Sequence, residues 1–293
     1  MLPPSVEETI EDIVDDHTSG ASRIAGMGLK ALETLVAEAP GGIPPDVLQE
    51  AARRIPEAQR TNAALYNVVH IFARLVQEGQ EPQAVVRRLR DDLESARQHV
   101  AKSLLKILPG RGSVVTLTFS ANVLSCLQLA GEKGLLDRVY VMESRPVNEG
   151  RFLVIALTEA GIRATLVPDA LGPSLLRDAS YALIGADSVL RDGAVINKIG
   201  SYSLGLAAAD AKKPLFVACE TLKFDARSDS SSWTGSPAMP AKELWDRPPE
   251  KIDMMNRYFE VVPSRLVTMV ATDRGAYAPD TIRTMLAQAK GPM

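Results

Sequence analysis

Three side chains that can bind or activate a small ligand follow two short apolar runs between residues 181 and 201. Asp187 follows the run ALI, and Asn197 and Lys198 follow the run AVI. An Asp-Gly pair lies between the two runs and is a turn signal, so the backbone is expected to reverse there and bring the three side chains together. A carboxylate, an amide and an ammonium at the end of a buried strand predict a site for a small anionic ligand.

A helix is expected to begin directly after these residues, at Gly200-Ser201, because a run of small residues of helical length follows. Its free N–H groups would lie beside the ammonium of Lys198 and favour an anion. The alternative interpretation is structural. In that case Asp187 caps a turn and Lys198 is solvated.

Polar side chains also follow the other predicted strands of this part of the chain. The carboxyl ends of parallel strands lie at one edge of a sheet, so these side chains should converge with Asp187. Among them, Arg145 and Lys198 are candidates for phosphate binding. A guanidinium can donate two parallel hydrogen bonds to a phosphate, and an ammonium attracts it as a point charge. No GxGxxG follows a strand and no GxxxxGK[ST] occurs, which disfavours a dinucleotide dehydrogenase and a nucleoside triphosphatase. The residues at the strand ends are Ser120, Glu143, Arg145, Asp169, Glu220 and Lys223.

Two kinds of periodicity divide the chain. Residues 1–108 carry apolar side chains at helical spacing, with helices expected over 5–16 and 21–38 and further helices opening at Pro56 and Pro82. Residues 109–293 alternate short β-type runs with helical ones. The fold class is therefore predicted as α/β, with a helical N-terminal domain and a Rossmann-like, doubly wound parallel sheet that meet at the turn cluster 108–112.

Composition limits the classes of partner. The net charge of −3 provides no basic field for direct nucleic-acid binding, and no apolar run reaches the length of a membrane helix, so a cytoplasmic protein is expected. Cys126 and Cys219 lie in apolar contexts and are expected to be core thiols. The three histidines lack metal-ligand spacing, so neither a metal nor another cofactor is expected.

The second domain contains the motifs Glu143-Ser144-Arg145-Pro146, Gly185-Ala186-Asp187, Asn197-Lys198-Ile199-Gly200 and Lys223-Phe224-Asp225. In their order and spacing these motifs resemble the initiation factor 2B alpha/beta/delta superfamily, which includes methylthioribose-1-phosphate isomerase and ribose-1,5-bisphosphate isomerase. In the first domain, Ser19-Gly20-Ala21 resembles the Arg-Gly-Ala phosphate loop of the isomerases, with Ser19 in place of the arginine. The segment at Arg60 resembles their second phosphate-binding segment.

The resemblance implies a homodimer with a pocket for a phosphorylated sugar or nucleotide between the two domains of each chain. It places Asp187 at the acid position of the isomerases. It also implies a translation-related protein as a candidate partner. The ligand contacts that it implies are Gly20, Ala21, Arg60, Arg145, Asn197, Lys198 and Lys223, and Ser120, at the end of the first predicted strand, is a further candidate contact.

The sequence departs from the isomerases at one chemically decisive position. Where they have a Thr-His-Cys-Asn segment after the first strand, this chain has Thr-Phe-Ser-Ala, so Ser120 replaces the cysteine. A thiol can exchange protons near neutral pH, whereas a serine hydroxyl needs a dedicated base. The substitution favours a non-catalytic, regulatory binding protein of the initiation factor 2B type. The alternatives are an aldose–ketose isomerase acting on a ribose phosphate and, if Arg145 and Lys198 are paired with internal carboxylates, a structural interaction module.

Overall fold

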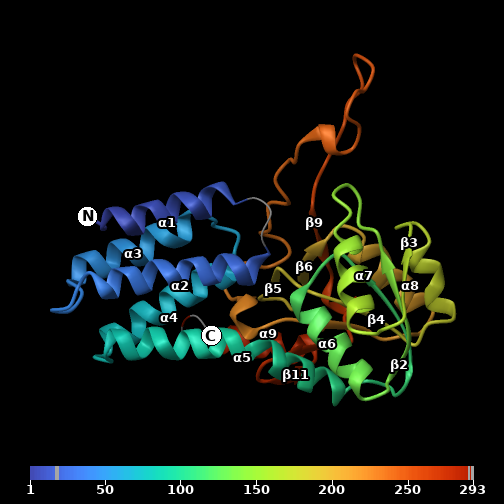
Figure 1. The fold of residues 1–293 in the computed structure, drawn as a ribbon, viewed down its shortest axis with the longest axis horizontal. Helices are drawn as coiled ribbons and strands as arrows, with labels where there is room; N and C mark the ends of the chain where they lie inside the picture. Colours follow the sequence, from blue (N-terminus) through green and yellow to red (C-terminus); the bar gives the residue numbers. More distant parts are fainter. Residues whose placement is uncertain (17–19, 290, 292–293) are drawn as a thin grey trace.

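The computed structural model describes residues 1–16, 20–289 and 291. A helical N-terminal half lies beside a C-terminal half that contains the sheets (Figure 1). The helices of the first half bury their apolar stripes against one another in a single core, and α1, α3 and α5 each begin with a proline in the first turn, where no N–H is needed. The five helices are α1 (Pro4–Asp15), α2 (Ala21–Ala37), α3 (Pro45–Glu57), α4 (Ala63–Gln77) and α5 (Pro82–Leu105).

The helix predicted to open at Pro56 is confirmed as α4, but its predicted start is wrong. Pro56 instead lies at the end of α3, where its missing N–H removes one hydrogen bond without stopping the helix. The next helix, α4, begins at Ala63 because the Oδ1 of Asn62 accepts a hydrogen bond of 3.0 Å from the backbone N–H of Leu65.

The long helix α5 belongs to both halves of the molecule. Its first half packs in the helical core through Val85 and Leu89, and its second half packs through Val100 and Leu104 on the strands and helices that follow. The chain then passes from α5 to the first strand through residues 106–111. The domain division at residue 108 stays a prediction.

The C-terminal half is built on a seven-stranded sheet in the order β11-β10-β7-β4-β1-β2-β3, parallel except for the antiparallel β10–β11 pair. Helices cover both faces: α5, α6 (Ala121–Glu132) and α7 (Gly150–Glu159) pack on one, and α8 (Ser201–Asp210) and α9 (Pro279–Gln288) on the other. The predicted fold class is confirmed. The strands are β1 (Gly112–Leu117), β2 (Leu136–Met142), β3 (Ala164–Val167), β4 (Tyr181–Ile184), β7 (Leu215–Ala218), β10 (Met269–Thr272) and β11 (Gly275–Tyr277).

The C-terminal half also contains a second, four-stranded sheet, which was not predicted. Its order is β8 (Phe224–Asp225), β5 (Ser188–Leu190), β6 (Val195–Lys198) and β9 (Phe259–Val262). The predicted reversal is confirmed, because β5 and β6 pair antiparallel and Gly193 adopts a φ of +79° in the turn. This hairpin carries Asn197 and Lys198 out of the main sheet and back toward Asp187.

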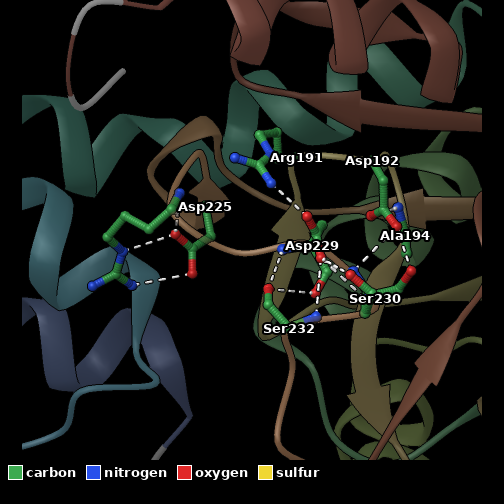
Figure 2. Close-up of polar contacts among 9 residues, drawn as sticks. Arg191, Asp192, Ala194, Asp225, Asp229, Ser230 and Ser232 are labelled. Atoms are coloured by element: carbon green, nitrogen blue, oxygen red, sulfur yellow. Dashed lines mark hydrogen bonds and ion pairs between the residues drawn. The ribbon is translucent and has the colours of Figure 1, made fainter.

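The segment between β8 and β9, residues 226–258, has one short 3₁₀ helix, Ala241–Glu243, and otherwise lacks regular structure. Part of it, drawn in orange, projects from the body of the molecule (Figure 1). Its beginning is tied to the β5–β6 turn, because Arg191 binds Asp229 and the backbone N–H of Ser230 donates to Asp192 at 3.1 Å (Figure 2). Hydrogen bonds from Ser231 and Arg191 hold the pKa of Asp229 below its usual range.

Within the described ranges, no helix combines the length and the apolar character that crossing a membrane would require.

Candidate functional site

A cavity of about 770 Å³ lies where the helical half meets the carboxyl ends of the main-sheet strands. Its wall is formed by the start of α2, the start of α6, the turn after β4, the end of β6 and Tyr258 at the end of the 226–258 segment. The structure therefore brings together most of the side chains that the sequence places at a common site. The predicted residues that line it are Gly20, Ala21, Ser120, Asp187, Asn197, Lys198 and Lys223.

Asp187 presents its carboxyl group to the cavity. Its backbone N–H donates to the carbonyl of Ile196 at 2.8 Å, but its carboxyl group makes no hydrogen bond with any described residue, so the turn-cap alternative is wrong. Burial raises the pKa of this carboxyl group, and the charges of Lys223 and Lys198 only partly oppose that rise. A carboxyl group in this state is suited to hydrogen-bond a ligand or to exchange a proton with it.

Lys198 is buried, so the alternative of a solvated ammonium is wrong. Its Nζ lies 2.6 Å from the Oε1 of Glu149 and 4.1 Å from the centroid of the Tyr258 ring. Glu149 comes from the start of α7, 49 residues earlier in the chain. A ligand anion at Lys198 would thus share the ammonium with an internal carboxylate.

Lys223 is also paired inside the protein. Its Nζ lies 3.3 Å from the Oε2 of Glu220, and both side chains are buried. Burial is the largest single influence and disfavours both charges. The attraction between the two groups, together with hydrogen bonds to Glu220 and the charge of Asp187 near Lys223, outweighs it, so the pKa of Glu220 is lowered and that of Lys223 is raised. Glu220 also accepts a hydrogen bond of 3.1 Å from Ser22 at the start of α2, which links the pair to the helical half.

Ser120 caps the start of α6, where its Oγ accepts a hydrogen bond of 3.4 Å from the backbone N–H of Val123. The end of β4 approaches it so closely that a Cβ at Gly185 would lie 2.7 Å from this Oγ, so glycine is required there. Two residues before Ser120, the β-branched Thr118 adopts a φ of +54°, a strained conformation of a kind that concentrates at functional sites.

Neither cysteine reaches the cavity. Cys126 and Cys219 are fully buried free thiols, as predicted, and burial raises the pKa of each well above its usual range. Among the described residues that line the cavity there is also no histidine. Its candidates for proton transfer are therefore carboxyl, ammonium and hydroxyl groups.

The N-terminus of α8 is closed to a ligand, contrary to the prediction. The Oε1 of Glu260, on β9, accepts a hydrogen bond of 2.8 Å from the backbone N–H of Tyr202 in the first turn. An internal carboxylate thus occupies the position that was predicted for an anionic ligand. Asn197 is tied to the same turn, because its Nδ2 donates to the Oγ of Ser201 at 2.8 Å.

Two predicted arginines lie away from the main cavity. Arg60 lines a second cavity of about 450 Å³ that shares Ala21, Asp187 and the Tyr258–Phe259 wall with the first. Arg145 lines neither cavity, and its exposed guanidinium donates to the carbonyl of Leu244 at 3.1 Å. Its backbone N–H donates to Asp169, which therefore holds the turn after β2 and is not a ligand contact.

The predicted loop position Ser19 falls outside the described residues.

Three further charged residues of the cavity, Arg23, Arg97 and Glu149, are not among the predicted ligand contacts. Arg23, in the first turn of α2, follows directly on the Gly20-Ala21 loop, so its place next to that loop is a usable signal. Arg97 and Glu149 reach the cavity through the packing of α5 and α7, which no local pattern reveals. No group of three or more potential metal-ligating side chains occurs in the described part of the chain.

Comparison with known proteins agrees with this architecture. The chain is 27% identical over 281 residues to a putative translation initiation factor eIF-2B subunit 2-like protein of Pyrococcus furiosus, covering 95% of this chain and 98% of the other. It is 29% identical to ribose 1,5-bisphosphate isomerase of Archaeoglobus fulgidus, covering 98% and 94%. The crystal structure of the translation initiation factor eIF-2B of Pyrococcus horikoshii superposes with a TM-score of 0.80 at 25% identity, covering 96% and 99%. Since residues 17–279 also match the Initiation factor 2 subunit family, the chain belongs to that family.

Proposed function

We propose that this protein binds a phosphorylated sugar or nucleotide in the main cavity and does not convert it. The observation that carries the proposal is that Ser120, and no thiol of the described residues, lines the cavity together with Asp187. An isomerase must remove a proton at one carbon or oxygen and return one at another, which calls for groups that can accept and donate a proton. The carboxyl group of Asp187 can act as one such group, whereas the hydroxyl of Ser120 cannot act as a second without a dedicated base.

The cavity suits a ligand of this class in size and in polarity. A volume of about 770 Å³ lies in the range of small-molecule sites. Its wall combines the carboxyl group of Asp187, the amide of Asn122 and several cations with the rings of Phe119 and Tyr258. A role in regulation, with a translation-related protein as partner, is part of this proposal and rests on the likeness to eIF-2B-type relatives.

Catalysis is the second candidate function, and one specific observation favours it. The raised pKa of Asp187 is the property expected of a general acid at neutral pH. A relative that matches nearly the whole chain is also named as an isomerase of a ribose bisphosphate. The two functions differ in turnover and not in binding, so turnover distinguishes them.

A thermal-shift screen tests the binding claim. Ribose 1,5-bisphosphate, methylthioribose 1-phosphate and nucleoside monophosphates should be compared with unphosphorylated ribose. A true ligand at 100 times its dissociation constant should add about 2.7 kcal/mol of apparent stability. If no phosphorylated compound stabilises the protein, the internal pairing of Lys198 and Lys223 would instead indicate a structural interaction module, and the binding proposal would fail.

A further inference from the structure

The second cavity, of about 450 Å³, adjoins the main cavity. The two share four wall residues, Ala21, Asp187, Tyr258 and Phe259. A volume of this size lies in the range of small-molecule sites. A group that is joined to a ligand in the main cavity can therefore enter the second cavity past this shared wall.

The charged side chains of the second cavity do not favour a phosphate group. Among the described residues that line it, the carboxyl groups belong to Asp16, Asp187 and Asp225, and the guanidinium groups to Arg60 and Arg227. Arg227 is already paired, because its Nε lies 2.8 Å from the Oδ1 of Asp225. Positive charge does not exceed negative charge in this cavity, so an uncharged group suits it better than an anion.

An aromatic side chain gives the second cavity a flat apolar surface. Trp233 lines the cavity, is half-buried, and packs against Leu190, Ala194 and Ile196 of the β5–β6 hairpin. With the described residues, its ring makes no aromatic or cation–π contact and its Nε1 makes no hydrogen bond. The ring is therefore available to stack on a planar group of a ligand.

The loop that carries Trp233 is held in place by its own hydrogen bonds. The carboxylate of Asp229 accepts hydrogen bonds from the backbone N–H groups of Ser231 and Ser232, at 3.1 Å and 2.9 Å. The backbone carbonyl of Asp229 accepts another from the N–H of Trp233 at 3.1 Å. The ion pair between Asp229 and Arg191 ties this loop to the β5–β6 turn (Figure 2). An aromatic side chain on a fixed loop loses little conformational entropy when a ligand binds.

Hydrogen-bonding side chains complete the lining of the second cavity. Arg60, Thr61 and Thr234 line it, and their side chains have no hydrogen-bond or ion-pair partner among the described residues. The guanidinium group donates hydrogen bonds, and the two hydroxyl groups can both donate and accept. A nucleobase has the matching chemistry, because it is uncharged, its faces are apolar and its edge carries donors and acceptors.

We propose that the second cavity binds the base of a nucleoside monophosphate, which stacks on Trp233, while the phosphorylated sugar lies in the main cavity. Arg60 then donates hydrogen bonds to the base and binds no phosphate. The placement of the base rests on the proposed function and narrows its ligand class to nucleotides.

The test is isothermal titration of the full chain with adenosine monophosphate and with ribose 5-phosphate, which lacks the base. Adenosine monophosphate should bind at least about tenfold more tightly, the gain expected for one stacked base. Trp233→Leu should weaken adenosine monophosphate by roughly tenfold and ribose 5-phosphate by less than about twofold. Trp245→Leu is the matched control, because Trp245 is 50% exposed and lines neither cavity, and it should change neither affinity.

Fluorescence provides a second measurement that leaves Trp233 in place. The chain has two tryptophans, so Trp245→Leu retains only the emission of Trp233. Adenosine monophosphate should quench this emission with the dissociation constant that calorimetry gives, since the base stacks directly on the ring. Ribose 5-phosphate should leave the emission nearly unchanged.

The outcomes separate this inference from the proposed function. If ribose 5-phosphate binds but adenosine monophosphate binds no more tightly and does not quench Trp233, the base site fails and the proposed function stands. If neither compound binds, the proposed function fails and the base site fails with it. Tighter binding of ribose 1,5-bisphosphate than of ribose 5-phosphate, lost in Arg60→Gln and kept in Trp233→Leu, would assign the second cavity to a second phosphate and overturn the inference.

Discussion

The Nζ of Lys198 and the Oε1 of Glu149 lie 2.6 Å apart across the main cavity wall, and the lysine side chain is only 4% exposed. This contact joins the end of β6 to the start of α7. It means that the cation which the sequence marks most clearly for phosphate binding is already occupied by a carboxylate. The charge available in the cavity therefore depends on Glu149 as much as on Lys198.

Glu149→Gln should increase the affinity for phosphorylated ligands, because it leaves the charge of Lys198 without its internal partner. A roughly tenfold gain in calorimetric titrations with ribose 5-phosphate is expected. The exposed Glu159 at the other end of α7 provides the control variant Glu159→Gln, which should leave affinity unchanged. Equal affinities of wild type and Glu149→Gln would show that Lys198 does not face the ligand.

Asp187→Asn should stabilise the protein at pH 7, by on the order of 1 kcal/mol. The pKa of Asp187 is raised in the folded state above its ordinary value of 3.8, so the folded state binds more protons than the unfolded state between those two values. The free energy of unfolding of wild type thus falls as pH rises through this window. The variant has no carboxyl group at this position, so its free energy of unfolding does not fall for this reason. Urea unfolding at pH 7 and near pH 3.5 checks this, since the advantage of the variant should shrink at the lower pH.

The exposed residue Asp178 supplies the control for this prediction. Asp178→Asn should not reproduce the stabilisation that Asp187→Asn shows at pH 7. An Asp187→Asn variant that is less stable than wild type at pH 7 would mean that the carboxylate is stabilised, not penalised, in the cavity.

Glu220→Gln should destabilise the protein by about 3 kcal/mol, because it leaves Lys223 charged and buried without its partner at 3.3 Å. Urea unfolding measures the change, and Glu132→Gln, at an exposed position on α6, is the matched control. A loss below 1 kcal/mol would indicate that Asp187 replaces Glu220 as the counter-ion of Lys223.

A homodimer stays a prediction, and light scattering should return twice the chain mass of 31.6 kDa. The helix α7 places two large apolar side chains in solvent, Phe152 at 61% and Ile155 at 54% exposure, so this surface is the expected contact. Phe152→Asp with Ile155→Asp should yield a monomer with an unchanged melting temperature. A monomeric wild type at micromolar concentration would rule the dimer out.

Local patterns were sufficient for most of the elements. Apolar periodicity predicted α1, α2 and α5, Pro82 marked the start of α5, and the Asp-Gly pair marked the β5–β6 turn. The second sheet was not predicted, because β8 and β9 pair with the hairpin from distant positions in the chain. Pairing between short, distant strands depends on the tertiary fold and leaves no local pattern.

The same limit applies to the site. Strand-end placement and family resemblance located Asp187, Ser120 and Lys223 at one cavity, because the carboxyl ends of parallel strands must meet. The charge state of the site could not be predicted, since the partner of Lys198 comes from α7 and the carboxylate at the start of α8 comes from β9. Arg145 was predicted from its place after β2, yet its side chain turns toward Leu244.

The most direct test of binding without conversion is to follow ribose 1,5-bisphosphate by phosphorus and proton NMR in the presence of the protein, at a concentration shown by titration to saturate the site. The expected result for wild type is a bound sugar phosphate and no ketose product over many hours. Conversion at an enzymatic rate by wild type, reduced by about 10² or more in Asp187→Asn, would contradict the account and establish the protein as an isomerase.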